Sequence, residues 1–404
     1  MKILIIQSWI RLGGAELISV RLAEQLQARG HEAGIACVYA DLEGMPAGAE
    51  RVDYFSPAGW LSRLCQRNRA AFLLLAPWLL LALTWKHGSG IDVLNPHNFP
   101  ASWVAVLVGA IKRIPVVWTC NEPPERMSLR PLEWRRLGDY LGWWLASSWI
   151  DRSIIRYVKS IYVPSVKTQL DVSRRYRRQA EIVRIGTDTG FQEVPQKPGL
   201  LEARAVRNPG VLSLVGKLHP QKNQIVCIRA MPVVLQQFPD AVLVLAGEGP
   251  WKGRLEKEVA KLGLGSSVRF LGRLDQAGIR SLYQEASLNL FPALNQSWGL
   301  TPFEALCAGT LSIVSNECGA AEVIAEQNIG IVCQPTPEAF AQAIIQTLRR
   351  REDLGPSVQR GRSFVVRNLT WSRYADTVLG IFTQTVSGHS TARIERVASQ
   401  GSRG

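Results

Sequence analysis

The chain has few of the residues that form cross-links or hold structural metals. Its 404 residues include only 5 histidines and 7 cysteines, with no Cys-x-x-Cys pair and no cluster of cysteine and histidine. Zinc sites and disulfide frameworks depend on such spacings, so the sequence indicates neither. The first residues, MKILII, are too short an apolar run for a signal peptide. We therefore expect a reducing, cytoplasmic compartment.

Long hydrophobic runs are absent too. The longest, from Ala70 to Trp85, has 16 residues and contains a proline, whereas a membrane-spanning helix needs about 20 residues. This excludes a polytopic membrane protein. Hydrophobic residues make up 47% and charged residues 20%, a globular composition that excludes a collagen-like or wholly disordered chain. At roughly 100–200 residues per domain, the length predicts two to four domains.

Acidic residues are outnumbered by basic ones. The chain has 33 Asp and Glu against 47 Lys and Arg, a net charge of +14. The excess peaks in residues 152–184, which hold nine basic and two acidic side chains, with arginines at 174, 175, 177 and 178. Such a cluster suits phosphate, nucleic acid or anionic lipid, and it is equally typical of a solvated helix face. No nucleic-acid recognition motif accompanies it, so no nucleic-acid partner is expected.

Short apolar runs alternate with longer amphipathic stretches from end to end, which predicts parallel sheets with helices on both faces. The runs expected to form buried strands are 2–7, 33–39, 91–95, 115–120, 160–164, 211–216, 241–246, 268–271, 288–292, 311–315 and 330–333. These strands are more than a single open sheet usually contains. We therefore predict an α/β fold with two Rossmann-like, doubly wound domains.

A proline-rich stretch without apolar periodicity marks the domain boundary. We place an N-terminal domain at 1–190, a linker at 191–209 and a C-terminal domain at 210–368. A helix is expected at 369–386, and the Ser/Gly/Arg-rich tail 387–404 is expected to be disordered.

Glycine turns follow the first strand of each half. Gly13-Gly14 precedes a predicted helix, and Gly216-Lys217, with Lys222 five residues later, follows strand 211–216. Open helix N-termini and two cations at the carboxyl edge of a sheet suit a diphosphate. Each segment is also explained by a tight turn or by solvated lysines. The first turn is not Gly-x-Gly-x-x-Gly, so a dinucleotide fingerprint is not indicated.

The most informative segment is 291–309, FPALNQSWGLTPFEALCAG. A strand leads into a loop, and a helix then begins near Thr301. Glu304 lies three residues after Thr301, as in a capping box, which would give it a structural role. The alternative is that Glu304 contacts a ligand, because the turn before the helix is open.

Six short motifs stand in an order that resembles a GT-B-fold retaining glycosyltransferase of family four (glycosyl transferases group 1). They are GGAE at 13–16, IGTD at 185–188, VGKL at 215–218, LAGEGP at 245–250, FLGR at 270–273 and WGL…EAL at 298–306. Together they cover about residues 1–385. The resemblance implies two Rossmann-like domains facing across a cleft, with the C-terminal helix crossing back to the N-terminal domain.

The resemblance also implies an activity. Family members move a sugar, with retention, from a nucleoside-diphosphate sugar to an acceptor. We expect a glycan or lipid-linked acceptor, in cell-surface polysaccharide or lipopolysaccharide assembly. No divalent metal and no other cofactor is expected, because the family usually needs none and the sequence has no DxD-type pair.

Site residues follow from matching the motifs position by position. Catalytic roles fall on His97, near the transferring sugar, and on Lys217 and Lys222, at the donor phosphates. Lys217 stands where the family has arginine, so it keeps the charge without the bidentate fork. The donor-binding set is Gly13, Gly14, Gly216, Gly272, Arg273, Gln296, Gly299, Leu300 and Glu304. Within that set, Glu304 matches the residue that binds the ribose hydroxyls.

One position departs from the family pattern of two glutamates with seven residues between them. Counting back from Glu304 gives Gln296, which hydrogen-bonds but carries no charge. Either the donor contact uses an amide, or donor choice has changed, or activity is weak. Two other functions therefore stay open: a catalytically weakened GT-B protein that binds a nucleotide sugar or an anionic polymer, and a nucleotide-sugar epimerase. The shortage of carboxylates argues against the epimerase.

Two segments are candidates for an anionic membrane surface. Residues 60–87 join an apolar run to flanking arginines and tryptophans, and 143–156 repeat that pattern more briefly. Such helices lie in a membrane interface. A buried helix beneath the N-terminal sheet is the alternative. On the first interpretation the protein is peripheral on the inner face of the plasma membrane.

Overall fold

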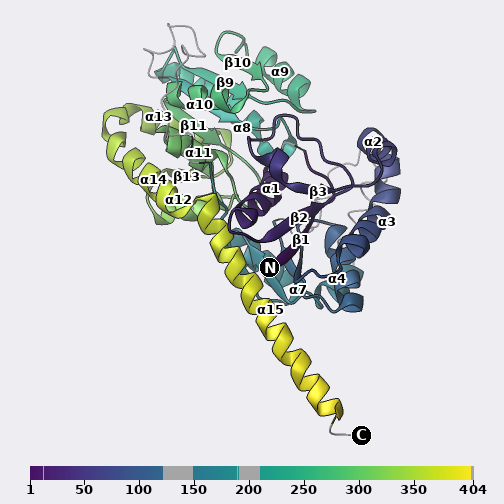
Figure 1. The fold of residues 1–404 in the computed structure, drawn as a ribbon. Helices are drawn as coiled ribbons and strands as arrows, with labels where there is room; N and C mark the ends of the chain where they lie inside the picture. Colours follow the sequence, from purple (N-terminus) through teal and green to yellow (C-terminus); the bar gives the residue numbers. More distant parts are fainter. Residues whose placement is uncertain (12, 122–148, 189, 191–209, 402–404) are drawn as a thin grey trace. The chain divides into compact units, whose positions relative to one another are not determined.

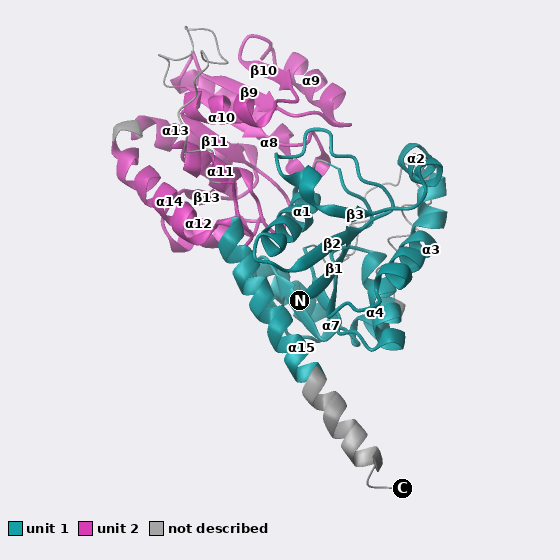
Figure 2. Cartoon of the chain, in the orientation of Figure 1, with its two compact units in different colours: residues 1–184, 371–404 teal, residues 185–370 magenta. Residues whose placement is uncertain are grey.

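The computed structural model describes residues 1–11, 13–121, 149–188, 190 and 210–401. The chain forms two compact units, shown in different colours in Figure 2. Unit 1 comprises Met1–Arg184 and Trp371–Gly404, and unit 2 comprises Ile185–Thr370. The predicted linker, 191–209, lies outside the described residues.

Unit 1 is built on parallel strands. β1 (Lys2–Ile6), β2 (Glu32–Ala36), β3 (Asp53–Phe55) and β4 (Val93–Pro96) pair in the order β3-β2-β1-β4. β5 (Val117–Thr119), β6 (Ser160–Val163) and β7 (Glu181–Ile182) pair in the order β5-β6-β7. A parallel bridge between Leu94 and Val116 brings β4 beside β5. The first six strands thus follow the 3-2-1-4-5-6 order of doubly wound dinucleotide-binding folds.

The helices of unit 1 cover both faces of these sheets (Figure 1). They are α1 (Gly14–Gln27), α2 (Gly59–Arg67), α3 (Arg69–His87), α4 (Ala101–Lys112), α6 (Trp149–Ile155), α7 (Val166–Tyr176) and α15 (Trp371–Gly401), with a 3-10 turn at Ala49–Arg51. The core is made by fully buried strand residues such as Leu4, Ile6 and Leu94, which pack with Ala105 and Val108 of α4.

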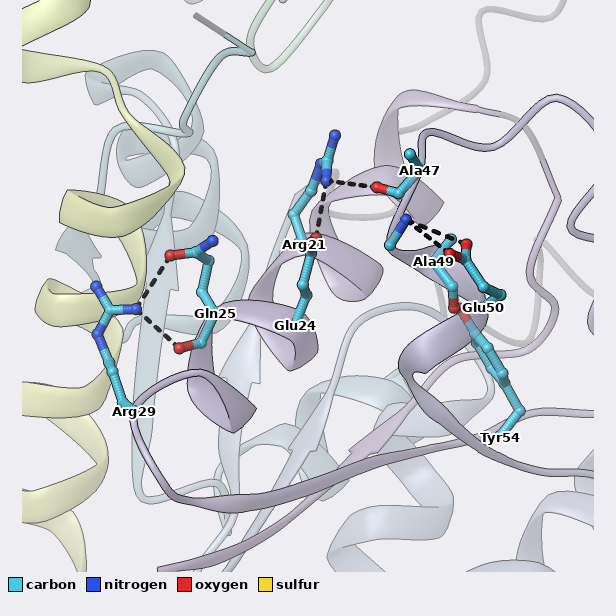
Figure 3. A network of polar contacts seen from close by, with 9 residues as sticks. Arg21, Glu24, Gln25, Arg29, Ala47, Ala49, Glu50 and Tyr54 are labelled. Atoms are coloured by element: carbon cyan, nitrogen blue, oxygen red, sulfur yellow. Dashed lines mark hydrogen bonds and ion pairs between the residues drawn. The ribbon is translucent and has the colours of Figure 1, made fainter. Parts of the chain in front are cut away.

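The C-terminal helix belongs to unit 1, as the resemblance implied. Arg29, just after α1, donates from Nε to Asp376 Oδ1 at 2.8 Å and from Nη2 to Ser372 Oγ at 2.7 Å, both on α15. Its Nη1 also donates to the main-chain oxygen of Gln25 at 2.8 Å (Figure 3). One guanidinium therefore joins the end of α1 to the start of α15.

The same helix is longer than the sequence suggested. α15 runs to Gly401, where a helix ending at 386 and a disordered tail from 387 were predicted. The segment 387–401 contains no proline, and alanine, arginine and glutamate among its residues favour helix. Composition rich in serine and glycine was therefore a poor guide to its backbone.

The apolar run of unit 1 is only partly buried. By length and composition alone, Ala70–His87 could cross a membrane, yet only 22% of that window is buried. Ala76, Leu80 and Leu83 face the core, whereas Leu74 and Trp78 are 72% and 70% exposed. A helix buried beneath the sheet was the alternative to a helix at a membrane. For the outer face of α3, that alternative is therefore wrong.

The basic cluster at 174–178 is partly structural. Arg178 donates to the carbonyl oxygens of Arg156 and Val158 at 3.0 and 2.9 Å, and Arg175 lies 3.5 Å from the buried Asp151. Arg174 is exposed near Asp171. Arg175 thus binds α6 and Arg178 binds the segment that follows it, so the cluster is not a free basic face.

Unit 2 repeats the strand order of unit 1. β8 (Val211–Val215), β9 (Val242–Ala246), β10 (Val268–Gly272), β11 (Leu288–Phe291), β12 (Ser312–Ser315) and β13 (Ile331–Cys333) are all parallel, in the order β10-β9-β8-β11-β12-β13. Its helices are α8 (Gln224–Gln237), α9 (Lys252–Lys261), α10 (Gln276–Glu285), α11 (Thr301–Ala308), α12 (Ala320–Glu326), α13 (Pro337–Arg349) and α14 (Gly355–Asn368), with 3-10 turns at Pro220–Lys222 and Arg351–Leu354. Each unit is thus a doubly wound α/β fold, as predicted.

The turns after β8 and β9 touch through glycine. Gly247 has φ +144°, and a Cβ built on it would lie 2.1 Å from the main-chain oxygen of Gly216. No side chain fits there, and the φ itself disfavours any residue but glycine. The close contact fixes the turn that carries Gly216 and Lys217.

We expect Gly247→Ala to lower the free energy of unfolding of unit 2 by about 2 kcal/mol or more, because it combines backbone strain with a clash. The matched control is Gly253→Ala, which lies within α9 and has nothing within 4 Å of its added Cβ. That change should raise stability by up to about 1 kcal/mol, because alanine favours helix. Urea unfolding measures both, and equal effects would contradict the contact.

Candidate active site

The predicted site residues lie where the strand order reverses. In unit 1 the neighbours β1 and β4 occupy that point, and in unit 2 the neighbours are β8 and β11. Ligands of open α/β sheets bind outside the carboxyl ends of such strands. Following β1 and β4 are Gly13, Gly14 and His97; following β8 and β11 are Gly216, Lys217, Lys222, Gln296, Gly299, Leu300 and Glu304.

The glycine turn of unit 1 opens directly into α1. Gly13 is its N-cap, in an extended conformation and without a side-chain cap. An added Cβ at Gly13 would lie 2.3 Å from Glu16 Oε2, whereas one at Gly14 meets nothing within 4 Å. Glu16 accepts a 2.6 Å hydrogen bond from Trp9 Nε1. Glu16 therefore supports the turn, and Gly14 stays exposed.

The loops after β1 and β4 are joined side by side. Ser8 donates from its main-chain nitrogen and from Oγ to Asn98 Oδ1, at 3.1 and 2.8 Å. The main-chain nitrogen of His97 donates to the oxygen of Ile6 at 3.0 Å. These bonds hold the glycine turn and His97 at adjacent strand ends.

His97 is a buried, neutral imidazole. Its side chain is 4% exposed, and its Nε2 lies 3.0 Å from Asn95 Oδ1. Burial lowers the pKa of His97 to about 3. At neutral pH it is therefore a hydrogen-bonding group without charge.

In unit 2 the structure joins Lys222 to the residue that departs from the family pattern. Lys222 Nζ donates to Gln296 Oε1 at 2.6 Å and lies 5.3 Å from the centre of the Phe291 ring. The surrounding loops are tied by two more bonds, from the Leu294 nitrogen to the Gln221 oxygen at 2.8 Å and from Asn223 Nδ2 to the Pro292 oxygen at 3.2 Å. An ammonium and an amide are thus held together at the switch point.

The other phosphate and base candidates occupy neighbouring strand ends. Gly247 donates its N–H to the oxygen of Gly272 at 2.7 Å and touches Gly216, so three strand ends lie close together. The side chains of Lys217 and Arg273 are exposed beside them. The Lys217 oxygen accepts from Gln224 Nε2 at 2.9 Å, which anchors its backbone while its ammonium stays accessible.

Glu304 does not form the capping box that its spacing allowed. The N-cap of α11 is Leu300, with no side-chain cap, because the helix begins one residue earlier than a Thr301 cap requires. The Glu304 carboxylate instead accepts from the Tyr283 hydroxyl at 3.3 Å. The segment before it is packed tightly, since a Cβ on Gly299 would lie 2.8 Å from the Phe291 ring.

The charge state of Glu304 is set by its neighbours. Burial, followed by the negative charge of Asp188, raises the pKa of Glu304 to about 7. The Tyr283 hydrogen bond and the charge of Lys222 act in the opposite direction. Asp188, Lys222 and Glu304 are thus within electrostatic reach of one another. Asp188 stands at the end of the motif IGTD, but no sequence pattern indicates Tyr283.

Two hollows of the described structure lie away from these residues. One, of about 530 Å³, is lined by α14 and the turn after α12, and includes Arg360 and Arg367. The other, of about 340 Å³, lies at the amino ends of β1–β3. Among the described residues no group of three or more His, Cys, Asp and Glu could hold a metal. That no metal takes part stays a prediction.

Two family models match consecutive parts of the chain. The model described as Glycosyltransferase Family 4 matches residues 12–191, and Glycosyl transferases group 1 matches residues 202–362. The chain belongs to this glycosyltransferase family. The resemblance inferred from short motifs is therefore confirmed, and the protein is an enzyme of the glycosyltransferase class.

Known proteins resemble this glycosyltransferase over different lengths. An uncharacterized glycosyltransferase of Methanocaldococcus jannaschii is 29% identical over 43% of the chain and 44% of its own length. A phosphatidyl-myo-inositol mannosyltransferase of Mycobacterium tuberculosis is 24% identical over 95% of the chain and 96% of its own. The crystal structure of Anabaena HepE with UDP and glucose superposes with a TM-score of 0.75 at 17% identity, covering 95% of this chain and 100% of that one.

The raised pKa of Glu304 predicts a pH dependence of stability. Its folded-state pKa of about 7 lies above the ordinary glutamate value of 4.5, so between these pH values the folded protein holds a proton that the unfolded chain loses. This contribution to stability is present below about pH 4.5 and is lost as the pH rises through 7. We expect Glu304→Gln to gain stability relative to the wild type between pH 5 and 8.

Urea unfolding at several pH values measures the difference. Glu338→Gln, at an exposed position in the first turn of α13, is the control and should leave the pH profile unchanged. Parallel profiles for wild type and Glu304→Gln would contradict the assigned environment.

Proposed function

We propose that this glycosyltransferase moves a sugar, with retention, from a nucleoside-diphosphate sugar to a lipid-linked acceptor in cell-surface polysaccharide or lipopolysaccharide assembly. The observation that carries the donor proposal is the Lys222–Gln296 pair at the switch point of unit 2, 2.6 Å apart. Lys217 is exposed on the adjacent turn. Two ammonium groups there suit a diphosphate.

The chemistry follows from where charge develops. As the bond between the sugar and the diphosphate breaks, negative charge grows on the leaving phosphate. Lys217 and Lys222 stabilise that charge because they are already in place. Glu304, when ionised, accepts hydrogen bonds from ribose hydroxyls, and Gly14 lets the start of α1 approach the donor. The acceptor oxygen attacks from the face that the diphosphate leaves, which gives retention.

A direct assay tests this proposal. Thermal shifts with UDP-, GDP- and ADP-sugars select the donor, because a bound ligand stabilises the folded state by mass action. Release of nucleoside diphosphate that depends on an added lipid-linked acceptor then shows transfer, and NMR of the product shows its anomeric configuration. Donor binding without transfer would favour the weakened binding protein, and an altered donor sugar would favour the epimerase.

We expect Lys222→Met to weaken binding of a nucleoside diphosphate roughly tenfold or more while leaving the nucleoside unaffected, because a charge-assisted hydrogen bond is worth about 1.5–3 kcal/mol. Lys217→Met should act in the same direction. Isothermal titration with UDP and uridine, or GDP and guanosine, measures it. Lys261→Met, exposed at the end of α9, is the control. Equal losses for nucleotide and nucleoside would count against a phosphate contact.

The acceptor side is inferred from the α2–α3 surface, defined as the exposed residues Trp60, Leu64, Leu73, Leu74, Trp78 and Trp85. On α2, Trp60 and Leu64 are four residues apart. On α3, Leu74, Trp78 and Trp85 follow at spacings of four and seven, so the residues on each helix form a stripe. The two helices lie along one flank of unit 1 (Figure 1). Large exposed apolar patches mark interaction sites.

The charge around this surface favours an anionic membrane as its occupant. Arg63 and Arg67 are exposed on α2, Lys86 is exposed at the end of α3, and Lys112 Nζ lies 4.7 Å from the Trp85 ring. Apolar and aromatic side chains among cations are typical of helices that lie in a membrane interface. The protein would then work peripherally on the cytoplasmic face. Of the second candidate, 143–156, residues 143–148 lie outside the described residues, and Trp149 is exposed.

We expect the protein to co-sediment with vesicles that contain anionic lipid, and added salt to weaken the binding. Leu74→Glu with Trp78→Glu should reduce binding at least about tenfold, because it removes two apolar anchors. Val233→Glu, at a residue of α8 that is 47% exposed, is the control. Protein that stays in the supernatant with every lipid would end the membrane proposal.

A further inference from the structure

A chain of buried polar side chains runs from His97 into the interior of unit 1. Asn95 lies on β4, Thr119 on β5 and Tyr162 on β6, and all are buried. The family resemblance places His97 near the transferred sugar, and the proposed function keeps it there; it gives no role to the other three residues. The hydrogen bonds of the other three determine which nitrogen of His97 carries its proton.

The orientation of the Asn95 amide is fixed by a main-chain carbonyl. One amide atom lies 2.6 Å from the oxygen of Val117, which can only accept a hydrogen bond, so that atom is Nδ2. Its second hydrogen goes to Thr119 Oγ1 at 2.9 Å. The oxygen Oδ1 is therefore the atom that faces His97.

This orientation decides the tautomer of His97. Oδ1 of Asn95 lies 3.0 Å from His97 Nε2, and an acceptor at that distance requires a hydrogen on Nε2. Thr119 Oγ1 also lies 3.3 Å from Nε2, but its own hydrogen goes to the Tyr162 hydroxyl, so it too faces Nε2 as an acceptor. A neutral imidazole has a single N–H, and burial keeps His97 neutral. Nδ1 is therefore an unprotonated acceptor.

That acceptor has no partner of its own in the part of the chain that the structure describes. Nδ1 of His97 is buried without a hydrogen bond. A buried polar atom left in this way costs about 1–3 kcal/mol. A hydroxyl group is the ligand donor that removes this cost.

We propose that Asn95 is a positioning residue that holds His97 as its Nε2–H tautomer, so that Nδ1 accepts a hydrogen bond from a hydroxyl of the transferred sugar. This proposal rests on the proposed function, in which His97 lies near that sugar. The Nε2–H tautomer makes Nδ1 an acceptor that takes a hydrogen bond from the hydroxyl, whereas an Nδ1–H tautomer would donate to the hydroxyl oxygen instead. Asn95 thus sets the direction of this hydrogen bond without touching the sugar.

The network continues beyond Asn95 and makes its orientation rigid. Thr119 donates to the Tyr162 hydroxyl at 2.5 Å. Tyr374, on α15, is also buried, and burial, followed by the charge of Tyr162, raises the pKa of Tyr374. The C-terminal helix therefore lies near the far end of the network that begins at His97.

Nitrogen NMR tests the tautomer without any assay of activity. With ¹⁵N-labelled histidine, His97 is assigned as the signal that His97→Gln removes among the 5 histidines. We expect the wild-type protein to show an N–H at Nε2 and an unprotonated Nδ1. Asn95→Leu should lose this preference. Asn289→Leu, which removes a buried asparagine of β11 in unit 2, should keep it.

The same NMR signal tests the hydrogen bond between His97 Nδ1 and the sugar hydroxyl. UDP-glucose or GDP-mannose should shift the Nδ1 resonance, whereas UDP or GDP, which lack the sugar, should not. A protonated Nδ1 in the wild type, an unchanged tautomer in Asn95→Leu, or equal shifts with and without the sugar would each overturn the proposal.

Kinetics test whether Asn95 acts through His97. We expect Asn95→Leu to lower kcat/KM for the donor about tenfold, the cost of roughly one hydrogen bond. In a His97→Gln background it should cause no further loss. An equal loss in both backgrounds would show that Asn95 acts elsewhere, and would overturn the positioning role. If no donor supports transfer, the proposed function fails while the NMR result still decides the tautomer.

Discussion

In each unit, two strands lie side by side in the sheet while the segments that follow them leave in opposite directions. This arrangement, at β1 and β4 and again at β8 and β11, keeps helices away from the space beyond the carboxyl ends. The residues proposed to act on the donor occupy those ends: the glycine turn and His97 in unit 1, Lys222 and Gln296 in unit 2. The chemistry depends on this topology because no single loop carries all of its groups.

Much of the fold could be predicted because buried parallel strands are continuous apolar runs. All eleven expected strands are present, whereas β3 and β7 escaped notice because they have three and two residues and are partly exposed. The site was harder. Glu304 matched a capping box as well as a ligand contact, and its pKa depends on Asp188, 116 positions away in sequence. The bond from Lys222 to Gln296 spans 74 positions, and local patterns contain no such information.

The amide at position 296 changes the electrostatics of the donor site. A glutamate bonded to Lys222 would neutralise much of its charge, whereas the neutral Gln296 orients the ammonium and leaves its charge uncompensated by that partner. The departure from the family pattern therefore need not weaken the phosphate contact. In the proposed function, an uncharged partner at position 296 suits a contact between Lys222 and the diphosphate, and it excludes a contact that requires a second carboxylate there.

The polypeptide starts and finishes in the same unit, since α15 packs against α1 after the chain has passed through unit 2. During synthesis, the middle of the chain can therefore complete its fold while the first unit still lacks its last helix. Until the ribosome releases the final residues, the interior around Tyr162 stays without its covering element. A chain that ends before α15 would contain a complete unit 2 and a unit 1 whose interior is open to quality control.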